Sequence, residues 1–178
     1  MKSGDTILLK SPKLAENIYY TKWSDLPCNR VECETTKDLA RFLGYFMGDG
    51  SYDGHTVSIC CDKRDLDIIE DIQKLATKLF GLDSSIRIVG NKDGGTEIRI
   101  HSVKLKGLFG VLGIIKYEDR QDSGVLTKRN ICVPKCIWQS PKEIIKEFLS
   151  SLFECDGFNG YKHYRVAFFG KDEQFVKD

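Results

Sequence analysis

Two short stretches of this 178-residue chain follow the same plan, and this repeat constrains the fold more than any other feature. Residues 42–50 read FLGYFMGDG, and residues 149–157 read LSSLFECDG. Each stretch is an apolar segment with small residues in its middle and an Asp-Gly pair at its end. The two aspartates, Asp49 and Asp156, lie 107 residues apart. A repeat at this spacing predicts a duplicated unit with pseudo-twofold symmetry.

The small residues predict that the two stretches form helices that approach each other closely, because no bulky side chain holds their backbones apart. These residues are Gly44 and Gly48 in the first stretch and Ser150, Ser151 and Cys155 in the second. Helices packed in this way bring Asp49 and Asp156 together at their C-terminal ends, where the helix dipoles disfavour negative charge. A divalent cation relieves that repulsion, and oxygen ligands favour Mg²⁺. The alternative is that each Asp-Gly pair merely ends a helix, with the glycine allowing a sharp turn into a strand.

Hydrophobic spacing predicts the elements around the first stretch. Thr35 or Thr36 can cap a helix that ends at the first Asp-Gly pair. Asp62 can cap a second helix, which Gly81 ends. Only one strand is evident between these two helices. The remaining predicted elements are a strand over residues 55–61, a hairpin with strands over 86–89 and 96–101, and a helix over 103–112.

The second stretch is preceded by a helix-start signature. Ser140-Pro141-Lys142-Glu143 has serine at the N-cap, proline at the first helical position and glutamate three residues after the serine, which predicts a capping box. This helix is expected to end at Asp156, and alternating side chains over residues 164–168 predict a strand after it.

The net charge is only +1, but basic residues are concentrated in one part of the chain. Residues 84–130 hold nine Lys or Arg and five Asp or Glu, so this sector carries +4 and the remainder about −3. A basic sector on a near-neutral protein is typical of a DNA-binding surface, and an ordinary solvated surface explains it equally well.

The seven cysteines favour reduced thiols, because their number is odd and Cys60 and Cys61 are adjacent. No signal peptide or apolar span is evident, so a cytoplasmic location is expected. A structural zinc site is an alternative, on the spacing of Cys28 with Cys33 and of Cys132 with Cys136. Neither pair has the tight knuckles or the histidines of a zinc module, and burial as small apolar side chains is the simpler reading.

The two stretches resemble the paired LAGLIDADG motifs of homing endonucleases. The second stretch is close to the family consensus, and the first departs from it at Met47, where the family often has an acidic residue. The resemblance covers residues 35 to about 170, and residues 133–138, which read VPKCIW, are similar to the linker of the family. It implies an α+β fold in which an αββαββα repeat carries an antiparallel, saddle-shaped sheet and is duplicated about a pseudo-twofold axis.

This resemblance sets the expected organisation of the chain. The expected segments are an N-terminal extension over residues 1–34, a first repeat over 35–112, a linker over 113–139 and the start of a second repeat over 140–178. Only 21 residues follow Gly157, whereas the first repeat uses about 62 after Gly50, so the second repeat is expected to be truncated. Chains of the family with two motifs are monomers, and a truncated second sheet could instead drive self-association through its exposed edges.

The resemblance also implies a function, the site-specific cutting of double-stranded DNA by hydrolysis of phosphodiester bonds with Mg²⁺ or Mn²⁺. In the family each motif aspartate binds a divalent metal at the centre of the cut site, which assigns catalysis to Asp49 and Asp156. The predicted metal site also includes the residues before them, Gly48 and Cys155. The sheet of each half lies in the major groove, and the DNA contacts this nominates are Arg87, Lys92, Arg99, His101, Lys162 and Arg165. Lys63 and Lys104 are the candidates for a lysine that stabilises transition-state charge.

A further resemblance concerns residues 4–9, GDTILL, which look like the strand that closes the N-terminal splicing portion of an intein. It implies an intein-encoded endonuclease. The chain begins without the Cys or Ser of a splice junction and ends without His-Asn, so it is not expected to splice. Two alternatives to an active endonuclease are a DNA-binding module without catalysis and a structural remnant of the same fold.

Overall fold

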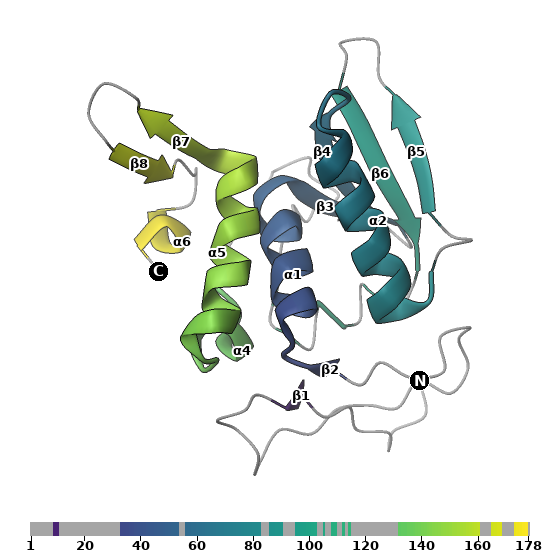
Figure 1. The fold of residues 1–178 in the computed structure, drawn as a ribbon. Helices are drawn as coiled ribbons and strands as arrows, with labels where there is room; N and C mark the ends of the chain where they lie inside the picture. The colour runs from purple at the N-terminus through teal and green to yellow at the C-terminus, as the bar shows by residue number, and fades with distance from the viewer. Residues whose placement is uncertain are drawn as a thin grey trace, which may run out of the picture.

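The computed structural model centres on two helices that stand side by side, α1 (Lys37–Asp49) and α5 (Lys142–Asp156) (Figure 1). The structure describes residues 9–10, 33–53, 56–82, 86–90, 95–102, 105, 108–109, 112, 114, 132–160, 165–168 and 173–177. Among these, no helix is both long enough and apolar enough to cross a membrane. The intein-like strand, the connector before residue 132 and the loop over residues 91–94 lie mostly or wholly outside the described residues.

Helix α1 begins as the sequence predicts. The Thr36 hydroxyl accepts a hydrogen bond from the Leu39 amide at 3.1 Å, so Thr36 rather than Thr35 is the N-cap. Six consecutive residues, 42–47, are buried, because α1 packs against α5 on one side and against the sheet and α2 (Leu66–Phe80) on the other. The central position of this helix explains why its apolar character extends around most of its circumference.

The sheet beside α1 has four antiparallel strands in the order β3-β4-β6-β5. They are β3 (Gly50–Asp53), β4 (Thr56–Asp62), β6 (Gly95–His101) and β5 (Ile86–Gly90). The pattern of side chains shows only one clear strand between α1 and α2, but the αββαββα order implied by the resemblance has two, and β3 does pair with β4 along its whole length. The other three strands lie where the alternating side chains predict them.

One face of this sheet is covered by α2 and the core, as Figure 1 shows. Val57, Ile59, Ile98 and Ile100 are buried on that face. In the predicted third helix, Leu105, Leu108 and Phe109 are helical and buried, whereas Leu112, also buried, lies in a turn. The Phe109 ring stacks on Phe46 with centroids 4.1 Å apart. The apolar faces of the first repeat therefore meet in one continuous core.

Two predicted helix caps are wrong. Asp62 is the last residue of β4, and its carboxylate accepts hydrogen bonds from the backbone and side chain of Arg64, so α2 begins after Asp65 instead. The predicted end of α2 is confirmed, since Gly81 adopts the left-handed conformation with φ 64°.

The capping box before α5 is likewise absent from the structure. The Ser140 hydroxyl is buried and donates to the Cys136 carbonyl at 2.6 Å, which belongs to the short helix α4 (Lys135–Trp138). Pro141 therefore takes the N-cap position of α5, with no side-chain hydrogen bond. The Ser140 side chain therefore bonds to the end of α4 and does not cap α5.

The elements after α5 repeat the order of the first half. The strands β7 (Gly157–Gly160) and β8 (Arg165–Phe168) form an antiparallel hairpin, and α6 (Glu173–Lys177) follows. The series α5, β7, β8, α6 thus matches α1, β3, β4, α2, as the pseudo-twofold duplication predicts. Near the N-terminus, β1 (Leu9–Lys10) pairs in parallel with β2 (Cys33–Glu34).

The contact between α1 and α5 is too close for side chains at two positions. A Cβ atom on Gly44 would lie 2.3 Å from the Phe148 carbonyl oxygen and 2.0 Å from the Ser151 hydroxyl oxygen. A Cβ atom on Gly48 would lie 2.5 Å from the Cβ of Cys155. Gly44, Gly48, Ser151 and Cys155 therefore let the helix backbones touch, as the repeat predicts, whereas Ser150 is exposed.

We expect the Gly44→Ala variant to lose about 2 kcal/mol of unfolding free energy, because the added methyl overpacks a backbone contact. The loss should appear although alanine favours a helix by about 1 kcal/mol over glycine. Urea titration followed by circular dichroism measures it. Gly90→Ala in β5 is the matched control, since nothing lies within 4 Å of its Cβ position. Equal stability of the Gly44→Ala variant and the wild type would contradict the tight contact.

Candidate metal and DNA-binding site

Both central helices end in the same local geometry. The amide of Gly50 donates to the Phe46 carbonyl, and the amide of Gly157 donates to the Phe153 carbonyl. Their φ angles, −86° and −81°, are ones that any residue adopts, so conformational freedom is not the reason for glycine. A Cβ atom would lie 2.4 Å from the carbonyl oxygen at Gly50 and 2.2 Å at Gly157. Glycine is needed because the chain turns back closely over its own helix, which makes each aspartate the last helical residue.

The contact between Gly48 and Cys155 brings the two aspartates near each other. Each of these residues directly precedes an aspartate, so the closest approach of the helices lies one residue before Asp49 and Asp156. The Cys155 thiol, which donates to the Tyr45 carbonyl at 3.8 Å, lies close enough to both aspartates for their charges to raise its pKa. Figure 1 shows both helix ends between the β7–β8 hairpin on one side and the four-stranded sheet on the other.

Two thiols near these helix ends have raised pKa values, mainly through burial and secondly through negative neighbours. Burial, together with the charges of Asp49 and Asp156, raises the pKa of Cys155 to about 12. Burial, followed by negative neighbours that include Asp65 and Asp49, raises the pKa of Cys61 to about 11. Both cysteines are therefore protonated near neutral pH, while a cation would be attracted. The oxygen donors at this place are carboxylates, and these suit a hard ion such as Mg²⁺.

The donor set is small. Within the described ranges no group of three or more His, Cys, Asp or Glu side chains is arranged to hold a metal. Two carboxylates are sufficient for Mg²⁺, which usually keeps several waters and takes further oxygens from substrate phosphates. Of the predicted metal residues, Gly48 and Cys155 are occupied in packing the helices together.

The alternative of a zinc site gains no support from Cys136. Its thiol is buried, and burial raises its pKa to about 11, as is usual for a cysteine of the core. Cys132 is partly buried, and Cys28 lies outside the described residues.

The outward face of the sheet carries the candidate DNA contacts of the first half. Arg87, Arg99 and His101 are exposed, and Arg87 stands directly opposite Arg99 in the pairing of β5 with β6. His101 lies opposite Thr56, with Nδ1 and Oγ1 3.0 Å apart. The alternation of side chains along β6 thus placed Arg99 and His101 correctly on one face, and the pairing of β5 with β6 adds Arg87 to it.

An acid on that same face was not among the predicted site residues. Glu97 accepts hydrogen bonds from the Arg99 guanidinium at 2.6 and 2.8 Å, and this bond, aided by Ser58, lowers the pKa of Glu97 despite partial burial. The period-2 alternation could have indicated it, since Glu97 and Arg99 are two residues apart on one strand. Arg99 is thereby paired within the protein.

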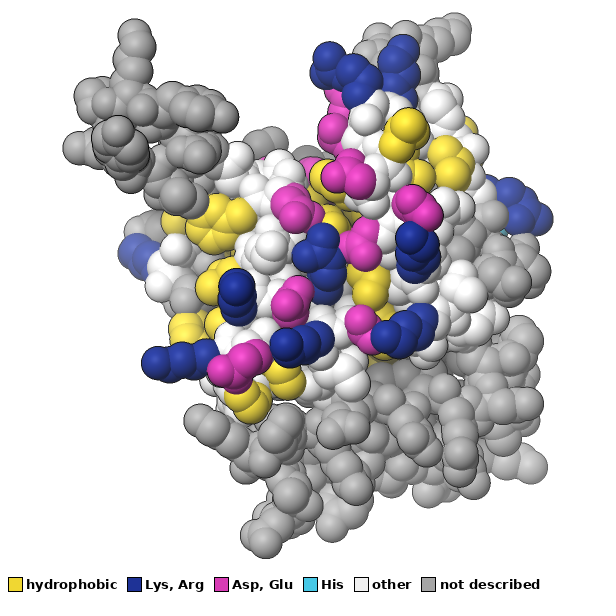
Figure 2. Space-filling view, in the orientation of Figure 1, with side chains coloured by type: hydrophobic (Ala, Val, Ile, Leu, Met, Phe, Trp, Pro, Cys, Tyr) yellow, Lys and Arg dark blue, Asp and Glu magenta, His cyan; other side chains and the backbone are white. Residues whose placement is uncertain are grey.

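The opposite, helix-covered side of the molecule has mixed charge. Figure 2 shows Lys and Arg side chains interspersed with Asp and Glu over α1, α2 and α5. Ion pairs on this side include Lys74 with Glu70 and Lys78 with Asp38. A surface with both signs interspersed is a poor match for a phosphate backbone, which leaves the outward sheet face as the better DNA-binding candidate.

The other predicted residues are placed less completely. Lys63 is exposed in the turn between β4 and α2, four residues beyond Ile59, the partner of Gly50 in the sheet. Arg165 begins β8, where only the backbone is described. Lys92, Lys104 and Lys162 lie outside the described residues.

Comparison with known proteins places the chain in a family. The family model of the LAGLIDADG-like domain matches residues 36–125, just over half of the chain. An uncharacterized protein of Methanocaldococcus jannaschii is 26% identical over 145 residues, which cover 76% of this chain and 18% of that protein.

Two further relatives have names that state a function. One is a subunit of the A-type ATP synthase of Pyrococcus abyssi, which is 30% identical over 72% of this chain and 11% of its own length. The other is the replication factor C small subunit of M. jannaschii, which is 26% identical over 83% of this chain and 7% of its own length. The chain spans less than a fifth of each of these relatives. The family match and the geometry of the paired helices agree, and the chain belongs to the family of LAGLIDADG-like domains.

Proposed function

We propose that this chain is the DNA-cutting module of a homing endonuclease that hydrolyses phosphodiester bonds of a specific duplex with Mg²⁺ or Mn²⁺. The observation that carries the proposal is the convergence of Asp49 and Asp156 beside the Gly48–Cys155 contact. Two carboxylates at the negative ends of two adjacent helices favour a bound cation. The family to which the chain belongs supports a nuclease function.

In this proposal Asp49 and Asp156, the last residues of α1 and α5, are the residues that would hold the ion. A bound divalent ion supplies an activated water and neutralises charge on phosphate oxygens. The Cys155 thiol is protonated and therefore does not compete with Asp49 as an anionic ligand.

The departure from consensus at Met47 does not argue against this function. The Met47 side chain is only 3% exposed and belongs to the core of the first repeat. An acid at this position would be expensive to bury there, and its absence removes no carboxylate from the surface near Asp49.

DNA binding is assigned to the outward sheet face. Arg87, Arg99 and His101 are exposed there, at the spacing of neighbouring strands. An antiparallel ribbon fits the major groove of B-DNA, where arginine reads guanine and phosphate contacts supply salt-dependent affinity. On this proposal Lys92, Lys162 and Arg165 extend the same surface.

The relatives support an inserted, intein-encoded element. Their names, those of an ATP synthase component and of a replication factor component, have no activity in common, and the chain matches a small part of each. A translation initiation factor and a transcription initiation factor match in the same way. A module shared by proteins with unrelated names is best explained as a mobile element carried within host proteins.

Replacing either motif aspartate by asparagine tests the catalytic assignment. We expect Asp49→Asn and Asp156→Asn to lower Mg²⁺-dependent cutting at least about a hundredfold, because the lost charge is that which holds the cation. Binding sites are first selected from a library of long randomised duplexes, and cutting of the selected duplexes is then followed on gels. Asp67→Asn, at an exposed position of α2, is the matched control and should cut normally. Cutting that survives both motif changes would rule out the proposed mechanism, and salt-sensitive binding without any cutting by the wild type would identify a DNA-binding module instead.

A second prediction concerns the pairing of Arg99 with Glu97. Glu97→Gln frees the guanidinium for a phosphate, so the slope of log affinity against log salt should steepen by about 0.9. Fluorescence anisotropy of a labelled duplex over a salt series measures this slope. Glu70→Gln is the control, because Glu70 pairs with Lys74 on the helix-covered side and its loss should leave the slope unchanged. If Glu70→Gln steepens the slope and Glu97→Gln does not, DNA binds the helix-covered side, and the assignment of the outward sheet face is wrong.

A further inference from the structure

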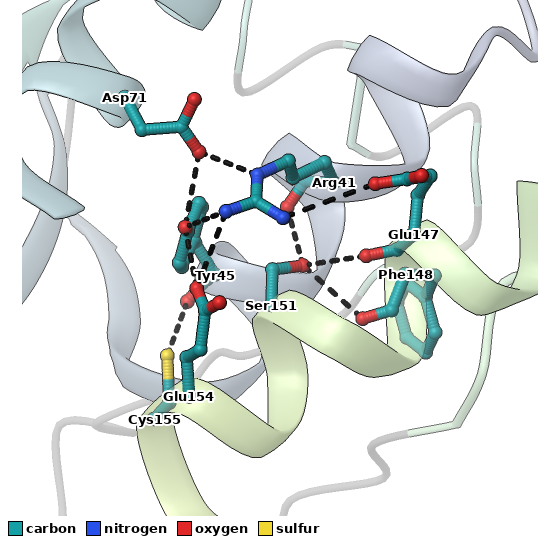
Figure 3. A network of polar contacts seen from close by, with 8 residues as sticks. All are labelled: Arg41, Tyr45, Asp71, Glu147, Phe148, Ser151, Glu154 and Cys155. Atoms are coloured by element: carbon teal, nitrogen blue, oxygen red, sulfur yellow. Dashed lines mark hydrogen bonds and ion pairs between the residues drawn. The ribbon is translucent and has the colours of Figure 1, made fainter. Parts of the chain in front are cut away.

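One polar cluster bridges α1, α2 and α5 close to the helix ends (Figure 3). Its members, called the Arg41 cluster below, are Arg41, Tyr45, Asp71, Glu147 and Glu154. The Tyr45 hydroxyl donates to Glu154 at 2.6 Å, lies 3.0 Å from an Asp71 oxygen and accepts from Arg41 at 2.8 Å. Arg41 also contacts Asp71 at 2.5 Å, Glu154 at 3.4 Å and Glu147 at 3.8 Å.

The cluster has one cation, Arg41, and three carboxylates. Each carboxylate forms its ion pair within the cluster with Arg41. Burial opposes the charge of Arg41, but the hydrogen bond to Asp71 and the nearby negative charges outweigh it and raise the pKa of Arg41. Burial and the hydrogen bond to Glu154 raise the pKa of Tyr45, which therefore stays a donor throughout the neutral range. The Tyr45 residue as a whole is fully buried, so its position is fixed by the core while its hydroxyl reaches the cluster.

The cluster continues a series of bonds that runs along the helix pair toward the aspartates. The Ser151 hydroxyl donates to the Arg41 carbonyl at 2.7 Å, and the Cys155 thiol lies 3.8 Å from the Tyr45 carbonyl. Arg41, Tyr45 and Asp49 follow one another at intervals of four residues, so they lie on one face of α1. Each link is thus one helical turn closer to Asp49 than the last.

The fit of the Phe148 carbonyl at Gly44 and of the Cys155 side chain at Gly48 opposes sliding of one helix along the other. Hydrogen bonds across the pair add a directional restraint, because they lose most of their strength when the geometry changes. Sliding of α5 along α1 would break the bond from Tyr45 to Glu154 at once. Asp71 extends the same constraint to α2, the helix that covers the DNA-binding sheet.

We propose that the Arg41 cluster is a positioning device, in which Tyr45 and Glu154 set the axial register of α1 against α5 and thereby the relative placement of Asp49 and Asp156. Its consequence for metal binding depends on the proposed endonuclease function. Its consequence for the helix pair does not, and so the two can be tested separately. None of the five residues is placed at the reacting atoms.

Thiol labelling measures the helix register without DNA or metal. Cys155 lies at the contact and reports its opening, and Cys136 in α4 reports general unfolding. With the full chain in EDTA, we expect Tyr45→Phe and Glu154→Gln to speed labelling of Cys155 about tenfold, as located by mass spectrometry, and to leave Cys136 unchanged. Tyr45→Phe alters no charge, so its effect is free of any change in thiol acidity.

Two matched controls remove a tyrosine hydroxyl and a glutamate charge outside the Arg41 cluster. Tyr52→Phe deletes a hydroxyl that bonds the Ile114 carbonyl, and Glu70→Gln neutralises a carboxylate in an ion pair within α2. Both should label like the wild type. Labelling of Cys155 within twofold of wild type in both test variants would overturn the proposal. So would an equal acceleration at Cys136, which would show that the cluster only stabilises the whole domain.

A second measurement connects the cluster to the proposed function. In both test variants, the Mg²⁺ concentration for half-maximal cutting should rise several-fold, with duplex affinity unchanged. Equal losses of duplex affinity and cutting would count against a positioning role. If the wild type neither binds nor cuts duplexes, the endonuclease proposal fails, and the labelling result still decides whether the cluster holds the register.

Discussion

The close backbone approach of α1 and α5 is the constraint on which the other features depend. At Gly44 the Phe148 carbonyl occupies the place of a side chain, and at Gly48 the Cys155 side chain does so. Ser151, buried between the helices, makes this approach tolerable because its hydroxyl donates to the Arg41 carbonyl across the contact. Asp49 and Asp156 are the last residues of the two helices, and the strands begin directly after them. A wider spacing between the helices would therefore move the two aspartates, and the hairpins after them, apart.

The elements that could be predicted are those stabilised by local features. The apolar spacing of α1 and α2 and the left-handed glycine Gly81 act within a few residues of the chain. β3 could not be predicted in this way, because Gly50–Asp53 has a single apolar side chain and is a strand only through its pairing with β4. Asp62 and Ser140 are residue types that often cap helices. Here the Asp62 carboxylate accepts from Arg64 and the Ser140 hydroxyl donates to the Cys136 carbonyl, so neither caps the predicted helix.

The same distinction separates the foreseen and unforeseen parts of the site. The pairing of the two motif ends followed from the repeat, and the shared face of Arg99 and His101 followed from strand alternation, whereas the place of Arg87 opposite Arg99 depends on the register of β5 against β6. The Arg41 cluster could not be foreseen, because it joins residues up to 113 positions apart and has no counterpart in the repeat. The residues 107 positions after Arg41 and Tyr45 are Phe148 and Leu152, which are apolar and buried.

This asymmetry gives the positioning cluster its physical reason. In a symmetric helix pair, a shift along the axis disturbs two equivalent halves equally, and the identical packing on both sides opposes it. Here the two sides of the pair are unequal: Phe42 is fully buried against Phe80 of α2, whereas Leu149, its counterpart 107 positions later, is 42% exposed. Packing from the second side therefore restrains α5 less than packing from the first side restrains α1. A directional bond from the well-packed helix to the less packed one, such as that from Tyr45 to Glu154, supplies the restraint that the apolar contacts do not.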